Sequence, residues 1–231
     1  MLRVGLTGSL GSGKSTVAEM LRELGAHVIE SDELGRELMK PGQTAFNEIV
    51  RFFGSEVLLP DGHLDRPRLA DLAFKDGRVK ELNAIIHPAV IEAQRRWMDE
   101  LFARDPEAVA VVVSALIFEV ERDAREAGEA SAAYTDLRKR IDRIILVTAP
   151  DDQKIARYVS RIGLNGMNRE RAELDARSRL AHQIPDAEKA ARADYLIENS
   201  GDVAALRAQV EALWPRLKAE SNSNPRNELL K

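Results

Sequence analysis

Short apolar runs recur along the chain, separated by longer stretches with helical spacing. The runs span residues 2–7, 26–29, 109–113, 144–148 and 195–197. Each is brief and lacks strict alternation, which is typical of strands buried on both faces of a parallel sheet. After the first run, apolar positions of residues 17–24 fall on one helical face. The alternation of strand and helix predicts a three-layer α/β fold with a mainly parallel five-stranded sheet.

A long stretch of helical pattern, about residues 38–107, separates the second run from the third. Turn signals punctuate it, and helices are expected near residues 45–53, 68–73, 79–85 and 88–104. We expect one domain over residues 1–218 whose core comprises residues 1–37, 108–150 and 193–218. Residues 121–140 have a helical composition, and the polar tail at 219–231 is expected to be disordered.

Composition narrows the class of protein. Of 231 residues, 44% are hydrophobic and 31% charged, which is typical of a globular chain. The absence of cysteine excludes disulfides and thiolate chemistry and fits a reducing compartment. With 34 basic and 38 acidic side chains the formal net charge is −4, which argues against a nucleic-acid partner. No apolar run approaches the roughly 18 residues of a membrane span, so a cytoplasmic protein without a membrane partner is expected. The sequence predicts no oligomeric state.

The most specific motif is G-x-x-x-x-G-K-S over Gly8–Ser15, which directly follows one predicted strand and opens a predicted helix. Glycines let backbone N–H groups converge on phosphate oxygens, and the helix N-terminus adds its dipole. Lys14 would carry positive charge to the β/γ-phosphates, and the Ser15 hydroxyl is the expected Mg²⁺ ligand. The alternative is a glycine-rich turn with an exposed lysine. Residues expected to bind ATP here are Gly8, Gly11, Ser12, Gly13, Lys14, Ser15 and Thr16.

Other motifs separate the classes of P-loop protein. No N-K-x-D guanine motif occurs, and the third strand runs into Ser114 rather than an aspartate for magnesium. Asp32 follows the second strand, where a small-molecule kinase places an acid that accepts the proton of the acceptor hydroxyl. The alternative is that Ser31 or Asp32 only caps the next helix.

Six further segments recur in order and resemble the dephospho-CoA kinase family. They are residues 28–37, 40–42, 61–66 (D-G-H-L-D-R), 82–88 (L-N-A-I-I-H-P), 116–119 and 192–201. The resemblance implies transfer of the γ-phosphate of ATP to the ribose 3'-hydroxyl of dephospho-CoA, the last step of coenzyme A synthesis. It further implies Asp32 as the base, a helical CoA-binding insertion at about 38–107 and a mobile lid. The chain departs from the family pattern at Glu30, often Asp, and at Ala115, usually Pro.

Four further residues are candidates for contact with the acceptor: Arg66, His87, Phe118 and Glu119. Arginine suits this role because its planar guanidinium can bond two phosphate oxygens at once. The competing interpretations are a surface ion pair for Arg66, a packed helical histidine for His87, and ordinary packing and a solvated charge for Phe118 and Glu119.

Residues 151–185 are expected to form the lid. Two helical segments flank a glycine-containing loop, and Arg157 and Arg161 share a helical face. Such a lid would close over ATP, with Arg161 acting on the transferring phosphate and Arg157 binding ATP. Asn199 follows the fifth strand and could contact the adenine edge. Solvated arginines and a turn asparagine are the alternatives.

Two other functions were compatible with the P-loop alone. One is a kinase of another small molecule, of the nucleoside, shikimate-like or gluconate-like kind; the long insertion argues against a smaller acceptor. The other is a regulatory module that uses nucleotide as a switch, against which the missing guanine motif and magnesium aspartate argue.

Overall fold

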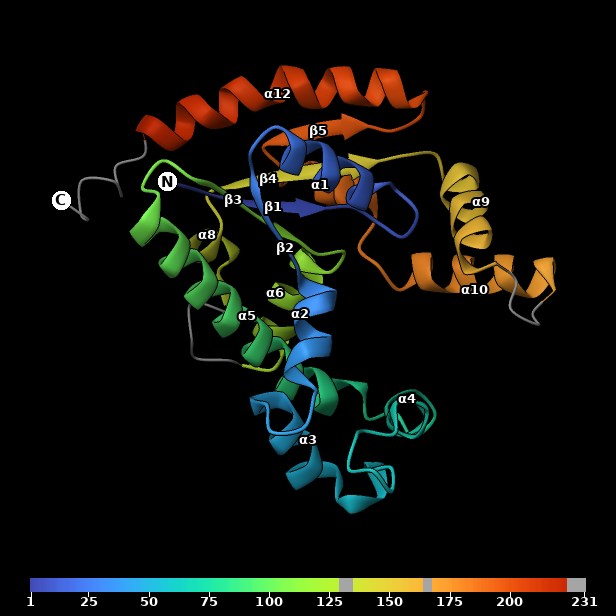
Figure 1. The fold of residues 1–231 in the computed structure, drawn as a ribbon. Coiled ribbons are helices and arrows are strands. Elements are labelled where there is room, and N and C mark those ends of the chain that lie inside the picture. The colour runs from blue at the N-terminus through green and yellow to red at the C-terminus, as the bar shows by residue number, and fades with distance from the viewer. Residues whose placement is uncertain (129–134, 164–167, 224–231) are drawn as a thin grey trace. The chain divides into compact units, whose positions relative to one another are not determined.

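The computed structural model describes residues 1–128, 135–163 and 168–223. Strands alternate with helices along the chain (Figure 1). The first half comprises β1 (Leu2–Thr7), α1 (Lys14–Glu23), β2 (His27–Glu30), α2 (Ser31–Leu38), α3 (Thr44–Phe53), η1 (Ser55–Val57), α4 (Arg66–Phe74) and α5 (Val79–Arg104). The second half comprises β3 (Val109–Val113), α6 (Ile117–Glu126), α8 (Leu137–Arg140), β4 (Arg143–Thr148), α9 (Asp151–Ile162), α10 (Arg169–Ala181), α11 (Asp186–Ala190), β5 (Tyr195–Glu198) and α12 (Val203–Ser223).

The strands form one five-stranded sheet in the order β2-β3-β1-β4-β5. β1 lies at its centre and pairs in parallel with β3 and β4, while β4 pairs in parallel with β5. All five residues of β3 are buried, as its valine-rich run requires. The predicted three-layer α/β fold is therefore confirmed, and the predicted strands match those of the structure to within one residue at each end.

One face of the sheet is covered by α1 and α12. Alternate residues of β1 and β3 point toward these helices and form the main apolar core with them. The helical contributions are Val17, Ala18, Met20, Leu21, Leu206, Val210, Leu213 and Leu217. The two helices lie close together on this face, so the P-loop helix α1 is held against the sheet along its buried side.

The opposite face carries α6 and α8 (Figure 1). The buried carboxylate of Glu121 holds this region together, because its Oε1 accepts from the Leu137 backbone N–H at 2.8 Å and from Arg125 at 3.0 Å. Its Oε2 accepts from Arg192, just before β5. The helical composition predicted for residues 121–140 is seen at both ends of that stretch, and residues 129–134 lie outside the described residues.

β5 is the last strand of the sheet, and its outer side is met by a side chain rather than by another strand. The Gln209 carboxamide accepts from the Glu198 N–H at 3.0 Å and donates to the Glu198 carbonyl at 2.8 Å. One glutamine of α12 thereby satisfies both backbone groups of this strand-end residue.

By the density of its contacts the chain divides into two compact units, residues 1–29 with 98–231, and residues 30–97. The second unit contains α2, α3, α4 and most of α5. Its core is an apolar cluster centred on Ile49, Phe53 and Val57.

Helix α5 corrects a sequence prediction. Two helices separated at Pro88 were expected, but α5 runs unbroken from Val79 to Arg104 with Pro88 inside it. Proline removes one backbone hydrogen bond from a helix. Apolar side chains on both sides of Pro88, among them Ile86 and Val90, pack against the same neighbouring helices. That shared packing stabilises a continuous helix despite the lost bond.

The C-terminal tail also differs from its prediction. Residues 219–223 are helical and complete α12, whereas residues 224–231 lie outside the described residues. Ser221 is fully buried, and its hydroxyl donates to the Glu107 carbonyl at 3.0 Å. The Met1 ammonium donates to the Ser221 carbonyl at 2.8 Å. These bonds to distant segments order a turn whose polar composition alone suggested disorder. Among the described residues, no helix has the length and apolarity needed to cross a membrane.

Candidate active site

The turn from β1 to α1 is shaped by glycines that the surrounding structure requires. Gly11 and Gly13 have φ angles of 72° and 97°, in the left-handed region that favours glycine. A Cβ at Gly11 would lie 2.2 Å from the Lys154 carbonyl oxygen, and one at Gly13 would lie 2.1 Å from Asn199 Nδ2. The loop is therefore packed tightly against α9 and the segment after β5, with no room for larger residues.

We expect Gly13→Ala to lower the free energy of unfolding by about 3 kcal/mol, because a left-handed φ and a clash with the buried Asn199 carboxamide add together. Gly25→Ala is a matched control in the same unit: its φ is 105°, but a Cβ there would have only an ordinary contact, 3.8 Å from Trp214. That control should lose about 1–2 kcal/mol. Urea denaturation of both variants measures the difference, and equal losses would contradict this packing.

Lys14 opens α1 and turns back over the loop. Its ammonium donates to the carbonyls of Gly8 at 2.7 Å and Ser9 at 3.1 Å. The first turn of α1 contains no acidic residue, and Gly13 at its N-cap supplies no side-chain cap. The helix therefore presents its N–H groups and the positive end of its dipole without neutralisation from its own first turn. Ser15 and Thr16 are exposed at this same helix start.

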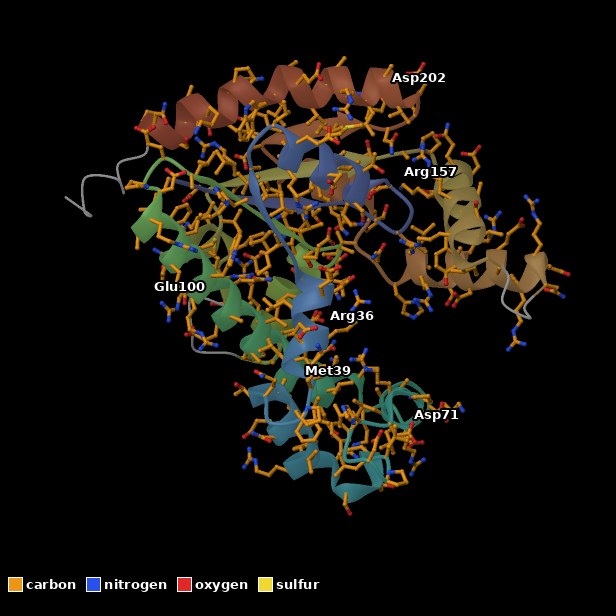
Figure 2. The ribbon with its side chains drawn as sticks, in the orientation of Figure 1. Arg36, Met39, Asp71, Glu100, Arg157 and Asp202 are labelled. Atoms are coloured by element: carbon orange, nitrogen blue, oxygen red, sulfur yellow. The ribbon has the colours of Figure 1, made fainter. Side chains whose placement is uncertain are left out.

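Two of the predicted ATP-binding residues lie together against the outside of the loop. Asn199 is buried, and its Nδ2 donates to the Ser12 carbonyl at 2.8 Å. Arg157 donates to the Asn199 carbonyl at 2.8 Å and to the Gly11 carbonyl at 3.5 Å. Arg157 is visible in Figure 2 on the helix beside the loop. Arg157 and Asn199 therefore both contact the loop by donating hydrogen bonds to its backbone carbonyl groups.

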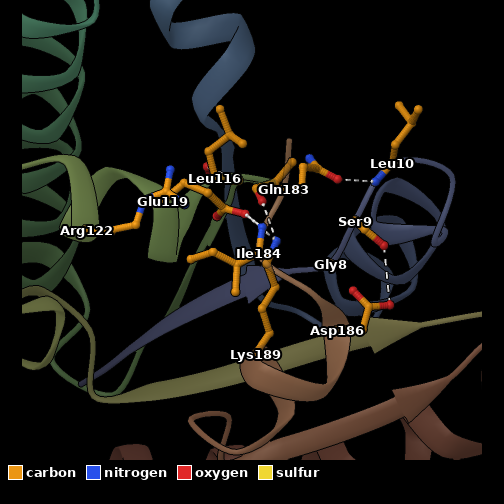
Figure 3. Close-up of polar contacts among 12 residues, drawn as sticks. Gly8, Ser9, Leu10, Leu116, Glu119, Arg122, Gln183, Ile184, Asp186 and Lys189 are labelled. Atoms are coloured by element: carbon orange, nitrogen blue, oxygen red, sulfur yellow. Dashed lines mark hydrogen bonds and ion pairs between the residues drawn. The ribbon is translucent and has the colours of Figure 1, made fainter. Parts of the chain in front are cut away.

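Sequence reasoning missed three residues that hold the loop from the other side. Asp186 Oδ2 accepts from the Ser9 hydroxyl at 3.3 Å, and Gln183 Oε1 accepts from the Leu10 N–H at 3.0 Å (Figure 3). Asp186 Oδ2 also accepts from the Lys154 ammonium at 2.6 Å. Lys154 is 4% exposed although it is a lysine. Its position beside apolar Ile155 was a signal of burial and Asp151 is a local ion-pair partner, but Asp186 lies 32 residues away and no local pattern indicated that pair.

Phe118 and Glu119 lie in the first turn of α6, and both are buried. Phe118 has no exposed surface, and its ring is covered by the Arg192 guanidinium at 4.5 Å. Glu119 is 4% exposed and forms an ion pair of 2.8 Å with Lys189, which is itself fully buried. Ordinary packing, the alternative for Phe118, describes its position in this structure. Glu119 is therefore a buried, ion-paired carboxylate rather than a solvated charge, and its contact with the acceptor stays a prediction.

The predicted lid region contains a pair of packed helices, α9 and α10. Tyr158 of α9 donates to Asp175 of α10, and burial raises the pKa of the Tyr158 phenol, an effect to which this hydrogen bond adds. The guanidinium groups of Arg161 and Arg179 each lie 5.7 Å from the centre of the Tyr158 ring. Arg161 is exposed at the end of α9, and residues 164–167 of the expected loop lie outside the described residues.

In the second unit, Asp32 is exposed in the first turn of α2. The capping alternative is not what the structure shows, because the N-cap is Glu30 and its side chain makes no capping hydrogen bond. Ser31 instead accepts a hydrogen bond from Gln94 at 2.9 Å. Asp32 makes no hydrogen bond or ion pair with any described residue, so its carboxylate can accept a ligand proton.

The other acceptor candidates of this unit differ in exposure. Arg66 is exposed at the start of α4 and forms no ion pair with a described residue, while Asp65 caps that helix through the Arg68 N–H at 3.0 Å. His87 is half-buried within α5. Arg36, which sequence reasoning missed, is exposed one helical turn after Asp32 (Figure 2). The four-residue spacing was the signal that could have found it.

A parallel sheet of this order, with a G-K-S loop between β1 and α1 and arginines on the helices after β4, defines a P-loop kinase. The family model described as dephospho-CoA kinase matches residues 2–205. The chain belongs to the dephospho-CoA kinase family. The predicted family, fold class and kinase activity are confirmed, and the nucleoside, shikimate-like, gluconate-like and switch alternatives are set aside.

Individual relatives agree with this membership. A dephospho-CoA kinase of Moorella thermoacetica is 38% identical over 226 residues, covering 97% of this chain and 96% of the relative. One from Aromatoleum aromaticum is 42% identical over 221 residues, covering 95% and 96%. A crystal structure of a Thermus thermophilus protein superposes with a TM-score of 0.68 at 30% identity, covering 93% of this chain and 96% of that one.

Proposed function

We propose that this kinase transfers the γ-phosphate of ATP to the ribose 3'-hydroxyl of dephospho-CoA, giving coenzyme A and ADP. The 3'-oxygen forms a bond to the γ-phosphorus, the bond from that phosphorus to the β–γ bridging oxygen breaks, and the hydroxyl proton passes to a carboxylate. The observation that carries this proposal is the tightly held G-K-S loop at the start of α1, in a chain of this family.

The nucleotide end of the reaction rests on the P-loop. Backbone N–H groups of the loop and of the first turn of α1 would bind the phosphates, with Lys14 supplying positive charge at the β/γ-phosphates. Arg161, exposed at the end of α9, would approach the transferring group when the proposed lid, about residues 151–185, closes. Water would then be excluded from the γ-phosphate. Asn199 is proposed to lie at the adenine edge.

Magnesium would be bound chiefly by the nucleotide. Mg²⁺ in kinases is typically held by substrate phosphates with few protein ligands. The Ser15 hydroxyl fits this role, because it is exposed at the α1 start and makes no hydrogen bond to any described residue. No group of three or more His, Asp or Glu side chains among the described residues is placed to hold a metal. When bound, the ion neutralises charge on the β- and γ-phosphates.

The acceptor end of the reaction is assigned to the unit of residues 30–97, which includes most of the proposed CoA-binding insertion at about 38–107. Asp32 would accept the proton of the 3'-hydroxyl, since it is exposed and carries no competing partner among the described residues. Arg66 and Arg36 are exposed arginines without ion pairs to described residues, so they can bind acceptor phosphates. His87, half-buried in α5, is proposed to shape the acceptor pocket rather than to react.

We expect Arg66→Ala to raise the KM for dephospho-CoA about 10- to 100-fold, since a hydrogen bond to a charged group is worth about 1.5–3 kcal/mol. The KM for ATP should change little. Arg68→Ala is the matched control: Arg68 lies on the same helix but forms an exposed ion pair with Glu56 at 2.7 Å. Steady-state kinetics with each substrate varied in turn tests both, and an equal effect of the two variants would contradict the assignment.

Substrate identity is tested by measuring ADP release with dephospho-CoA, shikimate, gluconate and nucleosides as acceptors. Dephospho-CoA alone should stimulate release, and phosphorus NMR of the product should show a new 3'-phosphomonoester. No stimulation by dephospho-CoA, or a phosphate at another position, would overturn the proposed reaction. The absence of cysteine from all 231 residues supports a reducing compartment, and we propose the cytoplasm as the location.

A further inference from the structure

Residues 183–189, here called the strap, comprise the end of the connection from α10 and the first four residues of α11, and they contact the P-loop with two side chains. Gln183 Oε1 accepts from the Leu10 N–H at 3.0 Å, and Asp186 Oδ2 accepts from the Ser9 hydroxyl at 3.3 Å (Figure 3). These bonds reach the first half of the loop. Arg157 and Asn199 bond the carbonyls of the next two residues, so four consecutive loop residues are each held by a side chain from a distant segment.

The strap also contacts the segment that follows β3. The Ile184 N–H donates to Glu119 Oε1 at 2.9 Å, and the Lys189 ammonium lies 2.8 Å from that same oxygen. Lys189 also donates to the Ala115 carbonyl at 3.3 Å. β1 and β3 are neighbours in the sheet. The strap therefore joins the carboxyl ends of two adjacent strands, which is where open α/β sheets bind their ligands.

Two ion pairs that anchor the strap are largely buried. The side chains of Lys154 and Asp186 are 5% and 19% exposed, and those of Lys189 and Glu119 are 0% and 5% exposed. Burying such charges is unfavourable unless their geometry and hydrogen bonds compensate, so they are weak evidence for stability as such. Lys154 is satisfied by Asp186 at 2.6 Å and by Asp151 at 3.0 Å. The pairs fix where the strap lies more than they add to stability.

An apolar contact ties the same part of the loop to α9 and α10. The Leu10 side chain packs against the cluster that these two helices bury between them, which includes Ile155 and Tyr158. Leu10 therefore has its backbone N–H bonded to the strap and its side chain in the helix pair. The P-loop, the base of α9 and the strap form one connected arrangement.

We propose that the strap positions the P-loop for the nucleotide, with Asp186 as its central positioning residue and Gln183 as the second. Asp186 acts through the Ser9 hydroxyl and through Lys154, and it does not itself contact the nucleotide. A loop held in advance loses less conformational freedom on binding phosphate. This inference rests on the proposed function only in that the loop binds ATP, and it adds residues that neither the motif nor the family resemblance pointed to.

The experiment compares Asp186→Asn and Gln183→Ala with Glu121→Gln. Glu121 is the matched control because it is a buried carboxylate, 2% exposed, in two ion pairs and a backbone hydrogen bond, and none of these contacts reaches the P-loop. Each purified full-length variant is measured for ADP affinity by calorimetry, for the KM of each substrate and for Tm. Gln183→Ala leaves the charges intact, so it keeps the test valid if Asp186→Asn does not fold.

We expect Asp186→Asn to weaken ADP binding and raise the ATP KM about 10- to 100-fold, as small misplacements of a binding group do. Gln183→Ala should weaken ADP binding up to about tenfold, and the KM for dephospho-CoA should stay unchanged in both. Glu121→Gln should lower Tm while binding ADP as the wild type does.

ADP affinities of both strap variants within twofold of the wild type, with Tm lowered as in Glu121→Gln, would overturn the inference and leave the strap a purely structural element. Wild-type protein that binds no ADP would instead overturn the proposed function. The two failures are therefore distinguishable.

Discussion

Lys14→Ala is expected to lower kcat about 100- to 1,000-fold, the loss found when one preorganised group that stabilises transition-state charge is removed. The physical reason is that Lys14 is the first residue of α1, so the variant loses the positive charge that the sequence places at the phosphate loop. The Lys14 ammonium now donates to two loop carbonyls, which keeps it at the phosphate-binding turn. The loop fold itself rests on glycines and on bonds from other segments, so it should survive the change.

This expectation is checked by single-turnover measurement of ADP formation with saturating dephospho-CoA, together with Tm. Lys139→Ala, which removes an exposed lysine of α8, is the control and should keep wild-type turnover. Turnover of Lys14→Ala close to that of the wild type, with an unchanged Tm, would remove Lys14 from the proposed mechanism.

Asp32→Asn should lower kcat about 100- to 10,000-fold while changing the ATP KM much less, because proton acceptance contributes to the transition state and not to nucleotide binding. Asparagine has nearly the same shape but its amide cannot accept the hydroxyl proton. Asp32 is exposed and bonds no described residue, so the substitution leaves no buried group unpaired.

Glu33→Gln provides the control for Asp32→Asn. Both acids lie in the first turn of α2, so both substitutions weaken the favourable interaction with the helix dipole equally. Glu33→Gln should retain kcat within a few-fold. If Asp32→Asn raised the ATP KM and left kcat intact, Asp32 would be a nucleotide-binding residue rather than the base.

Much of the fold could be predicted from the sequence, because its signals are local. The valine run of β3 and the G-K-S turn indicate a buried parallel strand and a phosphate loop from a few neighbouring residues. Pro88 was misread because a local helix-breaking preference was outweighed by tertiary packing along α5. The helical end at residues 219–223 was missed because its stabilising bonds come from Met1 and Glu107.

The candidate site was predictable only where it follows from a motif. The Gly8–Ser15 loop and the place of Asp32 just after β2 could be inferred from chain order, but the bonds that hold the loop could not. Asp186 and Lys154 are 32 residues apart, and Asn199 lies 187 residues from Ser12. Polar residues so far apart show no shared period in the sequence. Their pairing is a product of the fold, and it was visible only in the structure.

The two hydrogen bonds between Gln209 and the outer edge of β5 have a consequence for solubility. A bare strand edge is a template on which a second chain can add its own strand, and that is a common start of aggregation. Because the Gln209 carboxamide already occupies the donor and acceptor of Glu198, an incoming strand would first have to displace it. Leu196 is 58% exposed on the same short strand, so without the Gln209 contact this strand edge would combine unpaired backbone groups with an exposed apolar side chain.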